Sequence, residues 1–138
     1  MGKFKSILLI DDDIATNEFH QIILKHADIT DSIFAVVSGQ EGLDYLTNSG
    51  KYESDQTTYP KPDLILLDIN MPGMNGFEFI EKYKLLKEDQ KVDHIIIMLT
   101  SSVNPADKEK SETIEEISDF KSKPLSISIA KELVTQYL

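Results

Sequence analysis

The sequence predicts an α/β domain with a parallel sheet that is covered by helices on both faces. Wholly apolar runs, such as residues 7–10, 64–67 and 95–99, alternate with segments of helical periodicity. A run without polar residues is too apolar for a half-exposed strand and is typical of a strand buried on both faces. Alternating strands and helices imply right-handed crossovers and therefore a parallel sheet. A chain of 138 residues is long enough for one such domain.

The first half of the chain predicts two strands and two helices. The first strand covers residues 4–10 and ends at three consecutive aspartates. The helix that follows should bury one apolar stripe with a histidine at its edge: Phe19, Ile22, Ile23 and His26. Residues 33–37 read as the second strand and residues 39–46 as the second helix. Residues 47–61 form a long polar connection without a catalytic signal.

The second half continues the same alternation. The predicted elements are a strand over 64–67, a helix burying Phe79, Ile80 and Tyr83, a strand over 95–99, a charged helix over 105–113, a strand over 117–120, and a final helix burying Ala130, Leu133, Val134 and Tyr137. Asn104 and Pro105 suit the N-cap and the first position of the charged helix. The whole chain thus predicts five strands that alternate with five helices.

The composition argues against several classes of partner. The formal net charge of −10 disfavours direct binding to nucleic acid or to an anionic membrane, because both need clustered Lys and Arg. The chain has no cysteine, so it offers neither a disulfide nor a thiolate metal site. Met1 does not open a leader of charged, apolar and small residues, and we expect a cytoplasmic protein.

Five polar side chains follow the ends of predicted strands. They are Asp11, Asp12, Asp68, Thr100 and Lys123. The carboxyl ends of parallel strands share one edge of the sheet, where open α/β sheets bind their ligands. The fold should therefore bring these side chains together, although the sequence separates them widely.

Three carboxylates at one edge repel one another, and a bound cation is the usual remedy. The donors are all oxygens, which favours Mg²⁺ over Zn²⁺. Asp13 is better explained as a helix cap. A cap needs only one acid, so the pair Asp11 and Asp12 favours metal binding.

A carboxylate beside Mg²⁺ can attack a phosphoryl group, and Asp68 would be this nucleophile. Lys123 and Thr100 would supply a cation and a hydroxyl to the phosphoryl oxygens. Pro124 follows Lys123, so the peptide bond between them is a candidate for the cis form. Asp68 alone is equally well explained as a turn residue, and Thr100 and Lys123 alone are better explained as ordinary strand-end residues. Only the combination favours a phosphoryl site.

In these motifs, the chain resembles the CheY-like receiver domains of two-component response regulators. The matching segments are 7–13, 62–76, 96–101 and 120–124. The resemblance covers essentially the whole chain. It implies a flavodoxin-like (βα)5 fold with strand order 2-1-3-4-5 and helices on both faces.

The resemblance also implies a role for each site residue. Mg²⁺ would be held by Asp11, Asp12, Asp68 and the backbone carbonyl of Asn70. A sensor histidine kinase or a histidine phosphotransfer protein would exchange the phosphoryl group with Asp68. Thr100 and Lys123 would contact this group, and Thr100 and Phe120 would act as the switch that changes a protein-contact surface.

Other functions stay open beside a phosphorylation switch acting on an unknown downstream protein. The chain is predicted to be one receiver domain, residues 1–138, without an effector domain. It could instead be a phosphorelay intermediate, or a pseudo-receiver that binds partners without phosphorylation. A phosphohydrolase of similar chemistry needs an acid where this chain has Asn70. A flavin protein would need a hydroxyl-rich or glycine-rich loop in place of residues 11–13.

Three further features concern the surface of the predicted domain. Glu116 and Ile117 replace the small Gly-Ala pair of the family, so the exit from the fourth helix should differ. The long connection over residues 47–61 is similar to that of stand-alone receivers paired with sensor kinases such as bacterial phytochromes. The three histidines, His20, His26 and His94, are predicted to lie at the surface or at the core margin without a role in the site.

Overall fold

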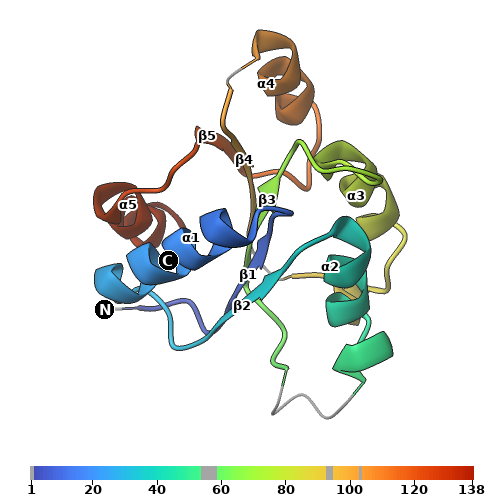
Figure 1. Cartoon of the computed structure of the whole chain (residues 1–138), viewed down its shortest axis with the longest axis horizontal. Coiled ribbons are helices and arrows are strands. Elements are labelled where there is room, and N and C mark those ends of the chain that lie inside the picture. The colour runs from blue at the N-terminus through green and yellow to red at the C-terminus, as the bar shows by residue number, and fades with distance from the viewer. Residues whose placement is uncertain (1, 54–58, 93–94, 103) are drawn as a thin grey trace.

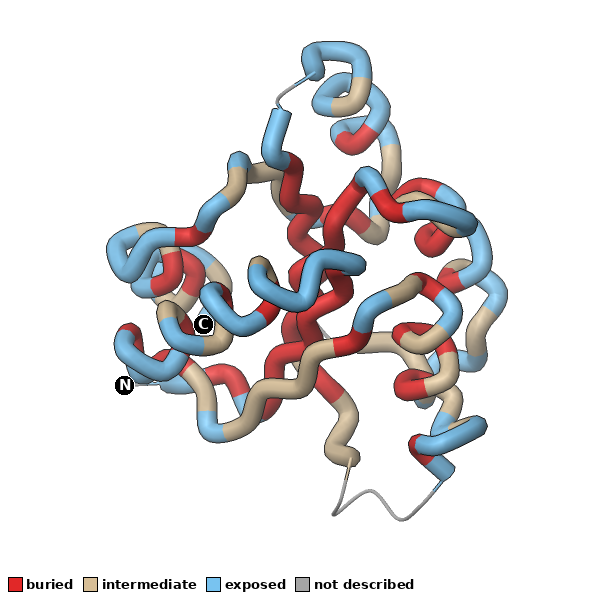
Figure 2. The backbone as a smooth tube through the Cα atoms, viewed as in Figure 1, coloured by how far each residue is buried: buried red, intermediate tan, exposed pale blue. Residues whose placement is uncertain are grey.

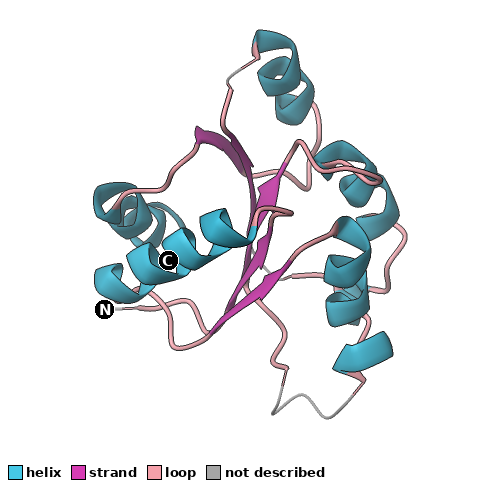
Figure 3. Cartoon of the chain, in the orientation of Figure 1, coloured by secondary structure: helices cyan, strands magenta, loops and turns pink. Residues whose placement is uncertain are grey.

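A computed structural model of the chain describes residues 2–53, 59–92, 95–102 and 104–138. Its centre is a sheet of five parallel strands in the order β2-β1-β3-β4-β5 (Figure 3). The strands are β1 (Ile7–Ile10), β2 (Ile33–Val36), β3 (Leu64–Asp68), β4 (Ile95–Thr100) and β5 (Asp119–Ser122). The predicted α/β class and strand order are confirmed.

Five helices cover the sheet, and α1 and α5 lie on the opposite face from α2 and α3 (Figure 1). The helices are α1 (Ile14–Ala27), α2 (Gly39–Leu46), α3 (Gly76–Tyr83), α4 (Pro105–Glu112) and α5 (Ile127–Tyr137), with short 3-10 helices at Gly50–Tyr52 and Glu88–Gln90. Within the described residues, no helix combines the length and apolarity needed to cross a bilayer.

The core consists of two apolar layers, one on each side of the sheet. In Figure 2, buried residues follow the central strands. Side chains alternate along a strand, so Leu8 and Ile10 enter one layer while Ile7 and Leu9 enter the other. All four residues of β1 are at most 1% exposed. The central strands are therefore fixed from both sides and can hold the loops at their ends rigidly.

The first helix buries a different face from the one predicted. Phe19 is 44% exposed and Ile22 is 53% exposed, whereas the buried residues of α1 are Asn17, His20, Leu24 and Ala27. The prediction failed because it ranked helix faces by apolar content alone, and two polar residues occupy the inward face.

The last strand begins two residues later than predicted. Ile117 closes a turn after α4, in which its N–H donates to the Ile114 carbonyl over 3.2 Å, and the Ser118 N–H donates to the Ile96 carbonyl over 2.8 Å. Ile117 is nevertheless buried in the core, which explains its strand-like apolar signal. Strand β5 follows, and its first residue, Asp119, lies opposite Ile97 of β4.

The fourth helix closely follows its prediction. It begins at Pro105, and the Asn104 side chain accepts from the Ala106 N–H over 2.9 Å. Only Ser111 is buried along this helix, and the helix extends beyond the end of the sheet in Figure 1. Lys110 lies over the ring of Phe77 at 4.4 Å, which links α4 to α3.

The connection between α2 and β3 contributes an aromatic cluster at the edge of the sheet opposite the strands' carboxyl ends. The cluster consists of Phe34, Tyr45, Tyr52 and Tyr59, with ring centroids 5.0 to 5.9 Å apart. The Tyr45 hydroxyl donates to the Pro60 carbonyl over 2.8 Å. Part of the polar connection predicted over residues 47–61, namely residues 54–58, lies outside the described residues.

Candidate functional site

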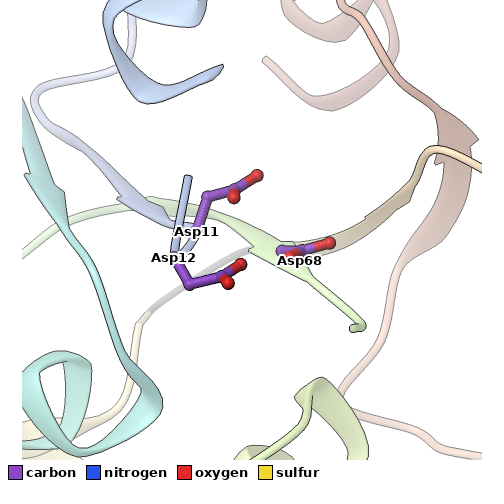
Figure 4. A group of neighbouring side chains, drawn as sticks. All are labelled: Asp11, Asp12 and Asp68. Atoms are coloured by element: carbon purple, nitrogen blue, oxygen red, sulfur yellow. The ribbon is translucent and has the colours of Figure 1, made fainter. Parts of the chain in front are cut away.

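A cavity of about 590 Å³ opens at the carboxyl edge of the sheet. Its lining comes from the loops after β1, β3, β4 and β5, from the start of α1 and from the last residue of β3: Asp11, Asp12, Asp13, Ala15, Thr16, Phe19, Asp68, Asn70, Ser101, Lys123 and Pro124. Figure 4 shows three of these side chains, with Asp11 and Asp12 at the end of β1 and Asp68 at the end of the neighbouring strand β3. Four of the five predicted strand-end residues thus line one cavity.

The register of the sheet explains why the aspartates meet. Ile10 lies opposite Leu67, so the next residue of each strand, Asp11 and Asp68, also fall side by side. Asp11 and Asp68 are each 4% exposed, whereas Asp12 is exposed. One carboxylate oxygen from each of Asp11, Asp12 and Asp68 lies within 4.8 Å of the other two. This set of hard oxygen donors fits a divalent cation such as Mg²⁺.

Lys123 joins the two buried carboxylates. Its ammonium group lies 2.6 Å from Asp11 Oδ2 and 2.8 Å from Asp68 Oδ1. Its backbone N–H donates to the Thr100 carbonyl over 2.7 Å, and the Lys123–Pro124 peptide bond is cis. The lysine therefore carries a positive charge into the centre of the acidic cavity.

The protonation equilibria of the cavity reflect this crowding. Burial raises the pKa of Asp68, and the nearby Asp11 raises it further, against the opposing effect of the Lys123 ammonium. Burial alone would lower the pKa of Lys123, but its contacts with Asp11 and Asp68 outweigh burial and raise this pKa. The lysine is therefore held in its charged form, whereas burial and the neighbouring Asp11 disfavour the ionised form of Asp68.

Thr100 is fully buried, and its hydroxyl is occupied by its own loop. Thr100 Oγ1 donates to the Ser102 carbonyl over 2.9 Å and lies 3.2 Å from the Ser102 N–H. The neighbouring Ser101, rather than Thr100, lines the cavity. Phe120 is half-buried and lies at a separate cavity of about 220 Å³ between α4 and β5.

The loop after β3 approaches its own strand closely at Gly76. A Cβ atom at this position would lie 2.8 Å from the Asp68 carbonyl oxygen and 3.0 Å from the Ile69 Cα. The Gly76 N–H donates to the Ile69 carbonyl over 2.8 Å. Glycine is therefore required for the start of α3 to pack against the backbone of Asp68, and Asn70 remains exposed at the cavity.

Asp13 behaves as the predicted helix cap. Its side chain accepts from the N–H groups of Ala15 and Thr16 over 3.0 and 3.3 Å. The hydrogen bonds from Thr16 lower the pKa of Asp13, in agreement with a carboxylate at a helix N-terminus. Asp13 lines the cavity but does not belong to the group formed by Asp11, Asp12 and Asp68.

Two polar residues near the site are missing from the sequence-based prediction. Asn17 is 3% exposed and donates from Nδ2 to the carbonyls of Asp11 and Val36 over 2.9 and 3.2 Å. His20 is 1% exposed, so its predicted place at the surface or core margin is wrong. Their spacing, three residues apart and in line with Leu24, was the available signal. His26 is exposed, and His94 lies outside the described residues.

Comparison with known sequences identifies the family of the chain. Residues 7–135 match the response regulator receiver domain family. The response regulator Rcp1 of Synechocystis is 31% identical over 103 residues, which are 75% of this chain and 66% of Rcp1. The chain thus spans about two thirds of the length of this curated relative.

Solved structures show the same fold. A two-component response regulator from Cytophaga hutchinsonii superposes with a TM-score of 0.83 at 32% identity, covering 97% of this chain and 96% of that one. The Mn²⁺-bound form of Rcp1 gives a TM-score of 0.74 at 26% identity, with coverages of 95% and 92%. The phosphorylated cyanobacterial phytochrome response regulator RcpA gives 0.74 at 26% identity, with coverages of 96% and 89%. With the family match over residues 7–135, these likenesses establish that the chain belongs to the response regulator receiver domain family.

Proposed function

We propose that the chain is a phosphorylation-dependent signalling switch, with Asp68 as the phosphoacceptor. The observation that carries the proposal is the position of Asp68, which is buried beside two further aspartates and contacts the Lys123 ammonium at 2.8 Å. A carboxylate of this kind has a cation next to it and an open cavity in front of it. These are the conditions for an attack on a phosphoryl group.

The phosphoryl donor would be a histidine kinase or a histidine phosphotransfer protein. An Asp68 oxygen forms the new O–P bond, the N–P bond of the phosphohistidine breaks, and the electron pair of that bond returns to the imidazole. Lys123 faces the oxygen atoms of Asp68 and would neutralise charge on the phosphoryl group. The product is an acyl phosphate on Asp68.

A divalent cation would be held by Asp11, Asp12, Asp68 and the backbone carbonyl of Asn70. The three carboxylates and their mutual distances fit a hard cation, and the likeness to a Mn²⁺-bound regulator supports this assignment. When bound, Mg²⁺ would neutralise the charge of the carboxylates and of the phosphoryl oxygens.

The switch would run through Thr100 and Phe120. In the structure, the Thr100 hydroxyl donates to the Ser102 carbonyl, and Phe120 lies at a cavity beside α4. A phosphoryl group on Asp68 would offer this hydroxyl a charged acceptor, and Phe120 would then move inward. Because α4 buries only Ser111, it is the element most easily shifted by such a change.

Acetyl phosphate provides a direct test of the acceptor. We expect wild-type protein in Mg²⁺ to gain one phosphoryl group, detected by intact mass, and to lose it in hydroxylamine, which cleaves acyl phosphates. Asp68→Asn should gain none. The matched control Asp13→Asn removes a carboxylate from the same cavity and should still be phosphorylated. If Asp68→Asn gains phosphate at the wild-type rate, Asp68 is not the acceptor.

A further inference from the structure

The inward face of α1 carries two polar side chains where the sequence offers apolar alternatives. Asn17 and His20 are 3% and 1% exposed, whereas Ile14, Phe19 and Ile22 on the same helix are 44% to 64% exposed. Burial of a polar group costs free energy unless the group is hydrogen-bonded. The burial of this face of α1 is therefore explained only if its polar side chains make hydrogen bonds that an apolar residue could not make.

For His20 the partner is the loop after β5. The Leu125 N–H donates to His20 Nε2 over 3.3 Å, and this bond joins positions 105 residues apart. An imidazole nitrogen that accepts must carry a lone pair, so the ring is neutral with its proton on Nδ1. Burial lowers the pKa of His20, the nearby Asp11 raises it and the Lys123 charge lowers it, with a net decrease that favours this neutral form.

The backbone of the loop that carries Lys123 donates few hydrogen bonds. Pro124 has no N–H, so the segment 123–125 has only two backbone donors. The Lys123 N–H donates to the Thr100 carbonyl over 2.7 Å, and the Leu125 N–H donates to His20. The Leu125 side chain is 1% exposed in the apolar layer beneath α1 and α5. His20 therefore accepts one of the two hydrogen bonds that the backbone of this segment donates.

The same face of α1 also contacts the loop of Asp11, which forms an ion pair with Lys123. Asn17, one turn before His20, donates to the Asp11 carbonyl over 2.9 Å. Asp11 and Lys123 meet at 2.6 Å. Helix α1 therefore contacts both loops of the ion pair: Asn17 bonds the loop of Asp11, and His20 bonds the loop of Lys123.

We propose that His20 is a positioning residue for phosphoryl transfer, which holds the Lys123–Leu125 backbone so that the Lys123 ammonium faces Asp68. The inference rests on the proposed function of Asp68 as the phosphoacceptor. His20 touches none of the reacting atoms in this assignment. It acts through Lys123, whose placement within 3 Å of a carboxylate is sensitive to small movements of the loop.

The test compares two substitutions of His20 with acetyl phosphate as donor. His20→Leu keeps the apolar bulk and removes the acceptor, and we expect the phosphorylation rate at saturating donor to fall about tenfold. The half-saturating donor concentration and the Mg²⁺ affinity should stay within about twofold, because Asn17 still holds the Asp11 loop. His20→Gln places an amide oxygen near the position of Nε2 and should restore the rate to within about twofold of wild type.

A double-mutant cycle separates positioning from a general structural effect. If His20 acts through Lys123, His20→Leu should cause no further loss in a Lys123→Ala background. His26→Leu is the matched control, since His26 is exposed on the same helix, and its rate should equal wild type. Should His20→Leu fail to fold, His20→Asn replaces it, because asparagine reaches only the Nδ1 position and should lose the rate that glutamine keeps.

The outcomes distinguish this inference from the proposed function. If wild-type protein takes up no phosphate, the proposed role of Asp68 fails. If wild type is phosphorylated and His20→Leu matches its rate, the positioning role of His20 is wrong. The same conclusion follows if glutamine gives no rescue, or if the effects of His20→Leu and Lys123→Ala multiply.

Discussion

Asp68→Asn should make the metal-free protein more stable at neutral pH, even though it removes the central residue of the site. Asp68 is 4% exposed and lies beside Asp11, and burial together with this neighbour raises its pKa. Asparagine removes the buried charge but keeps an oxygen that can accept from Lys123. Lys123 in turn keeps its contact with Asp11 at 2.6 Å.

The expected gain follows from the balance of burial and pairing. A charge that burial disfavours and that one lysine only partly compensates should cost the folded state about 1 kcal/mol, which is a typical size for the effect of one substitution. For a domain of this size, such a gain raises Tm by about 3–5 °C.

The pH dependence fixes the sign of the effect. Because the folded-state pKa of Asp68 is above its unfolded value, the folded protein binds this proton more tightly. The contribution of Asp68 to wild-type stability therefore falls as the pH rises from the unfolded pKa, about 3.9, through the folded pKa, and is then constant. Asp68→Asn lacks this loss, so its advantage should be small near pH 4 and full at pH 7.

Urea denaturation in EDTA from pH 4 to pH 8 measures the difference. The control Asp31→Asn removes an exposed carboxylate and should change the free energy of unfolding by less than about 0.5 kcal/mol. Added Mg²⁺ should stabilise wild type more than Asp68→Asn and reduce the gap. An Asp68→Asn protein less stable than wild type at pH 7 in EDTA, or an advantage independent of pH, would refute the reasoning.

Four further predictions concern single side chains. Asp12→Ala should weaken Mg²⁺ binding at least about tenfold by calorimetry, because it removes a proposed ligand. Gly76→Ala should cost about 1–3 kcal/mol in urea denaturation, since its Cβ would meet the Asp68 carbonyl at 2.8 Å. Thr100→Val should cost about 1 kcal/mol by the same measurement, because valine keeps the shape of threonine but lacks the hydroxyl that bonds Ser102. Ile22→Ser should leave Tm almost unchanged while Leu24→Ala lowers the unfolding free energy by about 2–5 kcal/mol, which tests the observed face of α1.

The centre of the sheet was predictable because β1 and β3 are buried on both faces and, like β4, read as unbroken apolar runs. The convergence of Asp11, Asp68 and Lys123 followed from the same reasoning, since it depends only on where parallel strands end. The last strand was misplaced because Ile117 is buried in a turn, and burial alone does not distinguish a turn from a strand.

The face of α1 could not be predicted from apolar periodicity. Phe19 and Ile22 make the stronger apolar stripe, yet the helix buries Asn17 and His20, which hydrogen-bond to the backbone of Val36 and Leu125. Partners of this kind lie far away in the sequence and are fixed only when the strands are in place. The engagement of the Thr100 hydroxyl with Ser102 was hidden for a different reason, because it depends on the conformation of one side chain.

The aromatic cluster at the far edge of the sheet gives the protein a built-in optical probe. The chain has five tyrosines and no tryptophan, and Tyr45, Tyr52 and Tyr59 are three of these emitters. They lie at the opposite end of the strands from the acidic cavity, so their fluorescence should be nearly silent to Mg²⁺ and phosphate. Emission from these three tyrosines would instead report the packing of the α2–β3 connection, with Tyr83 in α3 and Tyr137 in α5 contributing to the total signal. Coincidence of its melting curve with that of the far-ultraviolet signal would show that both ends of the sheet unfold in one cooperative transition.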